Sequence, residues 1–175
     1  AQARALVGLG REEQARKVLK PLADGGSPAA LAVLGRLALD ESRPDEALEF
    51  AERAVASGPT FGRALVLEAE AHLEKGDSEV AKTGFSRTLE LVPGLSPALH
   101  GLALANLELG KLGEAKAAAG AIVAGNRSSV IGHYLRGVVA SRQGDENQAI
   151  REFEAALGTN PGHEYSLLEL GTLKY

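Results

Sequence analysis

Several residue types are absent or scarce in this sequence: it has no cysteine, methionine or tryptophan, and aromatic residues make up 4% of its 175 residues. Without cysteine the chain forms no disulfide and offers no thiolate to a metal ion. Valine and isoleucine never cluster in the alternating runs of a strand. Because alanine, leucine and glycine dominate instead, we expect helices packed closely through small side chains rather than a sheet or a large aromatic core.

Long hydrophobic runs and a basic surface are also missing. No apolar stretch approaches the roughly 18 to 20 residues that a membrane span requires, so we expect no direct membrane insertion. The net charge of −4 is spread along the chain. No basic surface is left to neutralise a phosphate backbone, and the sequence therefore predicts no nucleic-acid partner.

The start and the composition of the sequence bear on the origin of the chain. The sequence opens with AQARALVGLG and lacks methionine, so we expect an internal piece of a longer protein. Its richness in alanine, glycine, leucine and arginine suggests a bacterium with a GC-rich genome. The sequence leaves the compartment unknown, with cytoplasm and periplasm both open.

The sequence does contain sets of similar residues that recur every 34 positions, and we call each such set a ladder. One ladder is alanine throughout, and a second consists of glycine or alanine. A third marks a turn with serine or glycine. The three ladders are Ala47, Ala81, Ala115 and Ala149; Gly35, Ala69, Ala103 and Gly137; and Ser42, Gly76, Gly110 and Gly144. Self-similarity at this fixed period is the mark of a stacked repeat architecture.

The ladders divide the chain into repeats of two helices, A and B, joined by a short turn. Four repeats are in strict register, and the two ends are incomplete. The repeats are 1–27 (incomplete), 28–61, 62–95, 96–129, 130–163 and 164–175 (incomplete), and together they predict a single array over 1–175. In the incomplete first repeat we expect helices over 1–9 and 12–23. Ser42 is predicted to cap the next B helix, and Asp145 and Gln148 have the spacing of a capping box.

The small-residue ladders have a physical reason. One helix pair cannot bury its apolar faces alone, so the pairs stack, and the backbones of helices A and B approach closely where they cross. Glycine or alanine on both helices allows that approach. Gly84 and Gly120 are different, because each lies inside a B helix, where glycine costs about 1 kcal/mol relative to alanine. The sequence shows no reason for either.

This pattern resembles the tetratricopeptide repeat, which has a 34-residue period, small residues at positions 8 and 20, apolar residues at 4, 7, 24 and 27, and proline at 32. The repeat that begins at Pro28 places Leu31, Leu34, Gly35, Ala47, Ala54 and Pro59 at positions 4, 7, 8, 20, 27 and 32. Position 4 is leucine or His133 rather than tryptophan, and position 11 is never tyrosine. The pentatricopeptide array, with its period of 35 and usually basic surface, fits less well.

The resemblance implies an all-α, right-handed solenoid whose concave groove is lined by the A helices at positions 2, 5, 9, 12 and 13. It implies a partner protein in that groove, as a peptide or a helical segment with an apolar anchor flanked by charge. The N-terminal half of the groove is mostly charged and the C-terminal half apolar and aromatic. The candidate groove residues are Arg36, Arg63, Val66, Glu70, Pro97, His100, Leu104, Ile131, Tyr134, Val138, Arg142, Tyr165 and Leu168.

Other functions are weighed against this one. Family members that hold the C-terminal carboxylate of chaperones use a set of lysine, asparagine and arginine positions that is missing here. The four histidines are scattered, and no nucleophile motif or phosphate-binding glycine loop occurs, so we expect no catalysis, no metal and no cofactor. The alternatives that stay open are a structural spacer, self-association through the open ends of the solenoid, and a regulatory segment of a larger enzyme.

Overall fold

The structure is a computed structural model that describes residues 10–58 and 62–174. All the secondary structure in these residues is helical, in agreement with the predicted all-α class. The helix expected over 1–9 lies outside the described residues. The helices are α2 (Glu12–Asp24), α3 (Pro28–Asp40), α4 (Pro44–Ser57), α5 (Gly62–Glu74), α6 (Ser78–Leu91), α7 (Ser96–Glu108), α8 (Leu112–Gly125), α9 (Val130–Arg142), α10 (Glu146–Thr159) and α11 (Glu164–Lys174).

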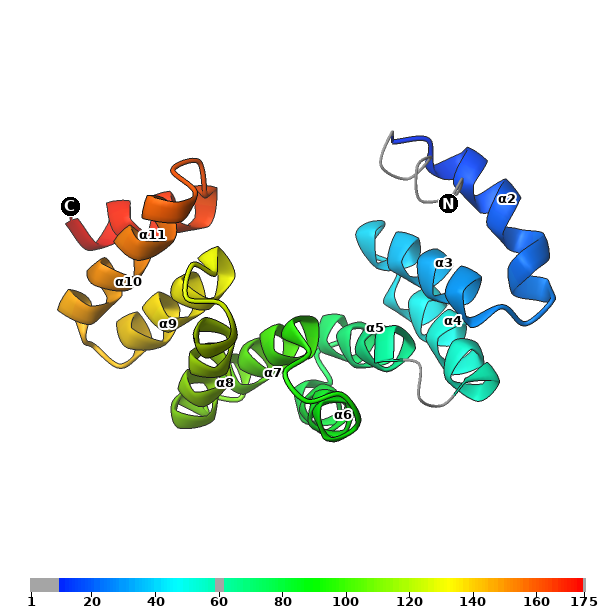
Figure 1. The fold of residues 1–175 in the computed structure, drawn as a ribbon, viewed down its shortest axis with the longest axis horizontal. Coiled ribbons are helices and arrows are strands. Elements are labelled where there is room, and N and C mark those ends of the chain that lie inside the picture. Colours follow the sequence, from blue (N-terminus) through cyan, green and yellow to red (C-terminus); the bar gives the residue numbers. More distant parts are fainter. Residues whose placement is uncertain (1–9, 59–61, 175) are drawn as a thin grey trace. The chain divides into compact units, whose positions relative to one another are not determined.

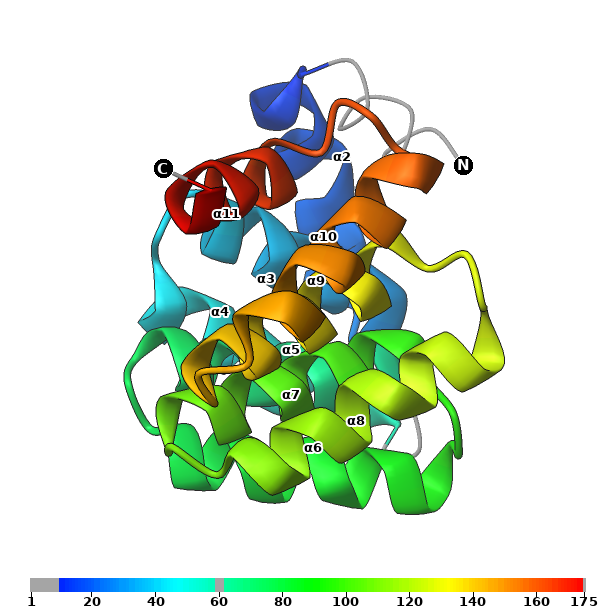
Figure 2. The same ribbon diagram turned by 90° about the vertical axis from the view of Figure 1, so that its left-hand side faces the viewer.

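The A helices recur with the 34-residue step of the predicted repeats. The A helices α3, α5, α7, α9 and α11 begin 34 residues apart, at the five positions where the repeats were predicted to begin. Each complete repeat pairs its A helix with the following B helix: α3 packs on α4, α5 on α6, α7 on α8 and α9 on α10. Figures 1 and 2 show α9 and α10 side by side in both views. The predicted solenoid of helix pairs is therefore present.

The chain divides into two compact parts, which we call the N-terminal part (Ala1–Leu91) and the C-terminal part (Val92–Tyr175). Consecutive repeats stack within each part, since α4 packs on α5 in the N-terminal part and α8 on α9 in the C-terminal part. A continuous array over 1–175 stays a prediction.

The small-residue ladders lie where the helices of a repeat cross. All four alanines of the B-helix ladder, Ala47, Ala81, Ala115 and Ala149, are 0% exposed. A Cβ added to Gly137 would lie 2.5 Å from the Phe153 ring, and one added to Gly35 would lie 2.4 Å from Leu67 Cδ2. Any larger residue at these two glycines would collide with a core side chain. The close approach predicted from the ladders is confirmed.

The turn between helices A and B uses the left-handed backbone region. Gly76, Gly110 and Gly144 have φ of 84°, 69° and 77°. Ser42 takes the same place with φ of 56°, and Arg43 is the residue before α4. The prediction that Ser42 caps α4 is therefore wrong: this serine fills the glycine position of the turn, where most side chains are strained. The Asp145 cap is confirmed, because its carboxylate accepts a hydrogen bond from Gln148 N at 3.0 Å.

Apolar side chains form separate core clusters within each half of the chain. A cluster in the N-terminal part joins α2, α3, α4 and α5, and a cluster in the C-terminal part joins α7, α8 and α9. Phe85 and Phe153, both 0% exposed, are the largest fully buried side chains in the described chain. None of the helices within residues 10–58 and 62–174 has the length and apolar character needed to cross a membrane.

Candidate functional site

In the C-terminal part the A helices carry an aromatic cluster on their surface. The Tyr134 ring on α9 lies 6.0 Å from the Tyr165 ring at the start of α11 and 5.4 Å from His163. On its inner side Tyr134 contacts Phe153 of the core, at 6.0 Å between ring centroids. Tyr134 is therefore supported by the core through Phe153, while Tyr165 is 65% exposed. Partial burial is the main reason that the pKa of the Tyr134 phenol is raised, and Glu169 adds to it.

Aliphatic side chains extend this aromatic cluster. Leu168, one helical turn after Tyr165, is 67% exposed, and Ile131, one turn before Tyr134, is 39% exposed. Leu104 and Val138 are partly buried and pack against the core cluster of α7, α8 and α9. The predicted apolar half of the binding surface thus has an exposed rim and a floor that is anchored to the core. We call the set Leu104, Ile131, Tyr134, Val138, Tyr165 and Leu168 the A-helix surface.

Three further predicted residues of the C-terminal part have different surroundings. His100 is partly buried on α7, and that burial lowers its pKa. Pro97 is exposed in the first turn of α7. Arg142 Nη1 donates a hydrogen bond at 2.7 Å to the carbonyl oxygen of Leu107, in the last turn of α7. A cation at that end of a helix is stabilised by the exposed carbonyls, so Arg142 has a structural role that sequence reasoning did not foresee.

In the N-terminal part, two of the three charged residues predicted for the groove pair with each other. Arg36 on α3 and Glu70 on α5 form an ion pair. Burial raises the pKa of Glu70, and it outweighs the opposite effect of the Arg36 guanidinium. Arg63 is exposed, whereas Val66 is 5% exposed and offers almost no side-chain surface to a partner. Of the groove residues predicted in the N-terminal part, Arg63 and the Arg36–Glu70 pair therefore have side chains at the described surface.

Comparison with known proteins identifies the family of the chain. The family model described as Tetratricopeptide repeat matches residues 1–61, 33–94 and 100–164. The chain belongs to the tetratricopeptide repeat family.

Solved structures of tetratricopeptide repeat proteins superpose well on the chain. TTC0263 from Thermus thermophilus is 19% identical with a TM-score of 0.85, and the match covers 99% of this chain and 95% of that one. YrrB, described as a TPR protein with an unusual peptide-binding site, is 18% identical with a TM-score of 0.70 over 95% of this chain and 87% of that one. The first TPR of Spaghetti (RPAP3), bound to the HSP90 peptide SRMEEVD, is 19% identical with a TM-score of 0.61 over 65% and 90%. No curated protein matches the sequence. At these identities the likeness shows the fold alone.

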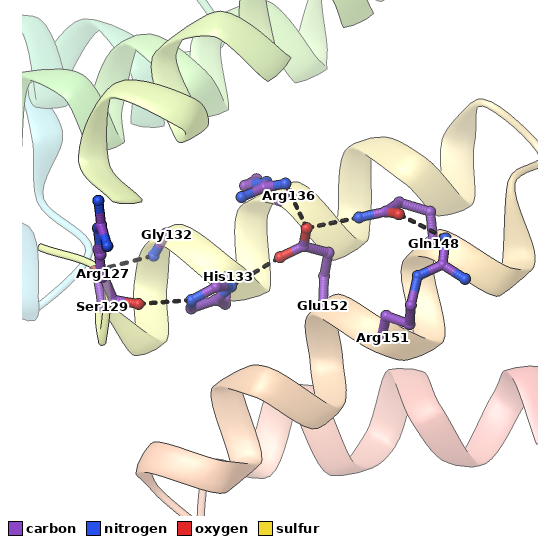
Figure 3. Close-up of polar contacts among 8 residues, drawn as sticks. All are labelled: Arg127, Ser129, Gly132, His133, Arg136, Gln148, Arg151 and Glu152. Atoms are coloured by element: carbon purple, nitrogen blue, oxygen red, sulfur yellow. Dashed lines mark hydrogen bonds and ion pairs between the residues drawn. The ribbon is translucent and has the colours of Figure 1, made fainter. Parts of the chain in front are cut away.

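The tetratricopeptide repeat over 130–163 contains a polar network where the family has apolar residues (Figure 3). Glu152 on α10 has a side chain only 7% exposed. Its carboxylate lies 2.8 Å from His133 Nδ1 and 2.6 Å from Arg136 Nη2, and it accepts a hydrogen bond at 2.6 Å from Gln148 Nε2. The other ring nitrogen of His133 lies 2.9 Å from the carbonyl oxygen of Arg127. The network ties α9 to α10.

Sequence reasoning did not foresee this network. Its signal was present, because His133 and Arg136 occupy positions 4 and 7 of the repeat, where the other complete repeats have mostly leucine. In this repeat the two polar residues at apolar positions share Glu152 on the facing B helix as their partner. In the residues that the structure describes, no three histidine, aspartate or glutamate side chains are grouped as a metal site would require.

Proposed function

We propose that this chain is a non-catalytic scaffold for protein interaction, and that the A-helix surface of its C-terminal part binds a segment of a partner protein. Tetratricopeptide repeat proteins are in general scaffolds of this kind, and the chain belongs to that family. Two neighbours of this fold support it further: YrrB is described as having a peptide-binding site, and the Spaghetti domain was solved with a bound peptide.

One observation carries the proposal: the exposed Tyr165 is in ring contact with Tyr134, which is itself packed on the buried Phe153. Rigid aromatic side chains with an apolar floor are the usual anchors of protein interfaces. Leu168 and Ile131 continue the exposed apolar area along α11 and α9.

The chemistry of the partner follows from this surface. An aromatic or branched aliphatic side chain on the partner segment would pack between Tyr134, Tyr165 and Leu168. Glu169 and Arg142 both lie close enough to Tyr134 to affect its titration, and the acidic Glu169 has the larger effect, so a basic residue beside the anchor would be favoured. We propose an amphipathic segment, extended or helical, with one apolar anchor and a neighbouring positive charge.

A peptide-display selection on the full chain tests this proposal. We expect enriched peptides to share an apolar or aromatic anchor, and the double variant Tyr165→Ala/Leu168→Ala to weaken their binding by about tenfold or more. Leu167→Ala is the matched control, since Leu167 is 49% exposed on the same helix but points about 100° away from Leu168.

The alternative structural role makes a different prediction. A spacer or self-assembling segment would enrich no common peptide, and its mass in light scattering would rise with concentration through contacts between copies. Equal binding of the enriched peptides to the wild type and to the double variant would reject the A-helix surface as the site.

A further inference from the structure

A slot opens between α5 and α6 of the N-terminal part, and it shares no residue with the A-helix surface described above. Its volume is about 420 Å³, within the range of ligand pockets in proteins, about 300 to 1,000 Å³. The slot is lined by Leu65, Glu68, Ala69 and His72 on α5 and by Glu79, Val80, Thr83, Gly84 and Arg87 on α6.

The slot lies where two of the other three complete repeats have a large side chain. Gly84 is at position 23 of its repeat, where the preceding repeat has Phe50, the following repeat Ala118 and the repeat over 130–163 Glu152. Both of the large residues face the A helix of their own repeat: a Cβ added to Gly35 would lie 3.3 Å from Phe50 Cβ, and Glu152 contacts Arg136. In the slot, a Cβ added to Gly84 would lie 3.0 Å from Ala69 Cβ.

The wall of the slot carries a charge that has no partner within the described residues. Glu68 occupies position 7, where the repeats before and after it have Leu34 and Leu102. It lines the slot and is partly buried, and residues 10–58 and 62–174 supply it with no ion pair or hydrogen bond. The equivalent residue in the repeat over 130–163 is Arg136, whose charge is met by Glu152 at 2.6 Å.

We infer that the slot binds a basic side chain of a partner protein, arginine above all, with its charged end on Glu68. The inserted side chain would take the place that Glu152 takes in α10, with the charges reversed. Leu65, Ala69 and Val80 provide apolar surface for the aliphatic stem of arginine, and the planar guanidinium can make two parallel hydrogen bonds to one carboxylate.

The end of the slot near Leu65 adds a second charged group, Arg87, that a partner could recognise. Gly84 faces Ala69, so Arg87, one turn further along α6, lies beside Leu65, one turn back along the antiparallel α5. The slot is therefore positive at the Leu65 end, whereas Glu68 in its middle and Glu79 at its other end are acidic. An acidic residue next to the inserted arginine would match this order of charges.

The first test uses a short probe, acetyl-Ala-Ala-Arg-Ala-Ala-amide, with matched peptides that carry lysine, phenylalanine or glutamate in place of arginine. Backbone amide chemical shifts of the ¹⁵N-labelled full chain are recorded during titration. We expect the arginine peptide to give saturable shifts at Ala69, Thr83 and Gly84, weaker shifts from lysine, and none from glutamate. An absence of saturable shifts with the arginine peptide, or tighter binding of the phenylalanine peptide, would overturn the inference.

Two variants test the mechanism. Glu68→Gln keeps the size of the side chain and should weaken the arginine peptide about fivefold or more, because a charge-assisted hydrogen bond is lost. Glu90→Gln is the matched control: Glu90 is an exposed carboxylate on α6 that does not line the slot, and its loss should leave the affinity unchanged. Equal affinity for the wild type and Glu68→Gln would reject Glu68 as the recognition group.

A third variant fills the slot. Ala69→Gly together with Gly84→Phe recreates the glycine and phenylalanine pair of α3 and α4, and we expect it to abolish the shifts while the helical circular dichroism is retained. If this variant does not fold, the isosteric Glu68→Gln comparison still decides. Because the slot shares no residue with the A-helix surface, Tyr165→Ala/Leu168→Ala should leave the arginine peptide unaffected, so the two proposals can fail separately.

Discussion

Replacing Gly84 and Gly120, the two glycines inside B helices, by alanine should have different effects on stability. At Gly120 nothing lies within 4 Å of an added Cβ, so Gly120→Ala should realise the full gain in helix propensity, about 1 kcal/mol. At Gly84 the added Cβ would lie 3.0 Å from Ala69 Cβ, and overpacking of a close contact costs about 1 to 3 kcal/mol. We therefore expect Gly84→Ala to be neutral or destabilising.

The free energy of unfolding is measured by urea denaturation, followed through the helical circular dichroism. A gain of about 1 kcal/mol for Gly120→Ala corresponds to a rise of roughly 2 to 4 °C in the melting temperature of a chain of this size. The exchange Ala69→Gly/Gly84→Ala relieves the contact and keeps the number of helical glycines constant, so it should return the stability close to that of the wild type. If Gly84→Ala stabilised the chain as much as Gly120→Ala, the close approach of α5 and α6 would be refuted.

Three other substitutions test the packing and the electrostatics. Ala115→Leu places a large side chain at a fully buried crossing and should lower the free energy of unfolding by about 1 to 3 kcal/mol, seen as a lower melting temperature. Glu152→Ala should cost a similar amount, about 1 to 3 kcal/mol, in urea denaturation, because it leaves His133 and Arg136 without their common acceptor. Burial lowers the pKa of His100 below 6.5, so the unfolded chain binds the proton more readily and stability should fall as pH drops through 6.5; His100→Gln should reduce that dependence in urea midpoints measured against pH.

The fold could be predicted from the sequence because its determinants recur. Each repeat presents the same local problem, two helices crossing through small residues, so Gly35 and Ala47 already indicate the plan and the later repeats confirm its period. The A helices begin at the predicted residues for this reason. Ser42 was misassigned because serine is a common helix cap, whereas the turn needs a left-handed residue at that place, as the glycines at the same position in the other repeats indicate.

The candidate site was less predictable, because its properties depend on contacts between residues that are distant in sequence. Arg142 reaches a carbonyl oxygen 35 residues earlier, and Val66 is buried although its place at position 5 of the repeat predicted a groove residue. The slot at Gly84 depends on the absence of a side chain, which only becomes visible when the same position is compared across folded repeats. The residues that recur in every repeat thus predict the scaffold, whereas the contacts of residues that differ between repeats become known only from the structure.

Chemical-shift mapping with a display-selected peptide shows most directly whether the A-helix surface of the C-terminal part binds a partner segment. On the ¹⁵N-labelled full chain, we expect saturable shifts concentrated at Tyr134, Val138, Tyr165 and Leu168 on α9 and α11, with α8 and α10 little affected. Shifts confined to the B helices α8 and α10, or no saturable shift with any selected peptide, would contradict binding at this surface.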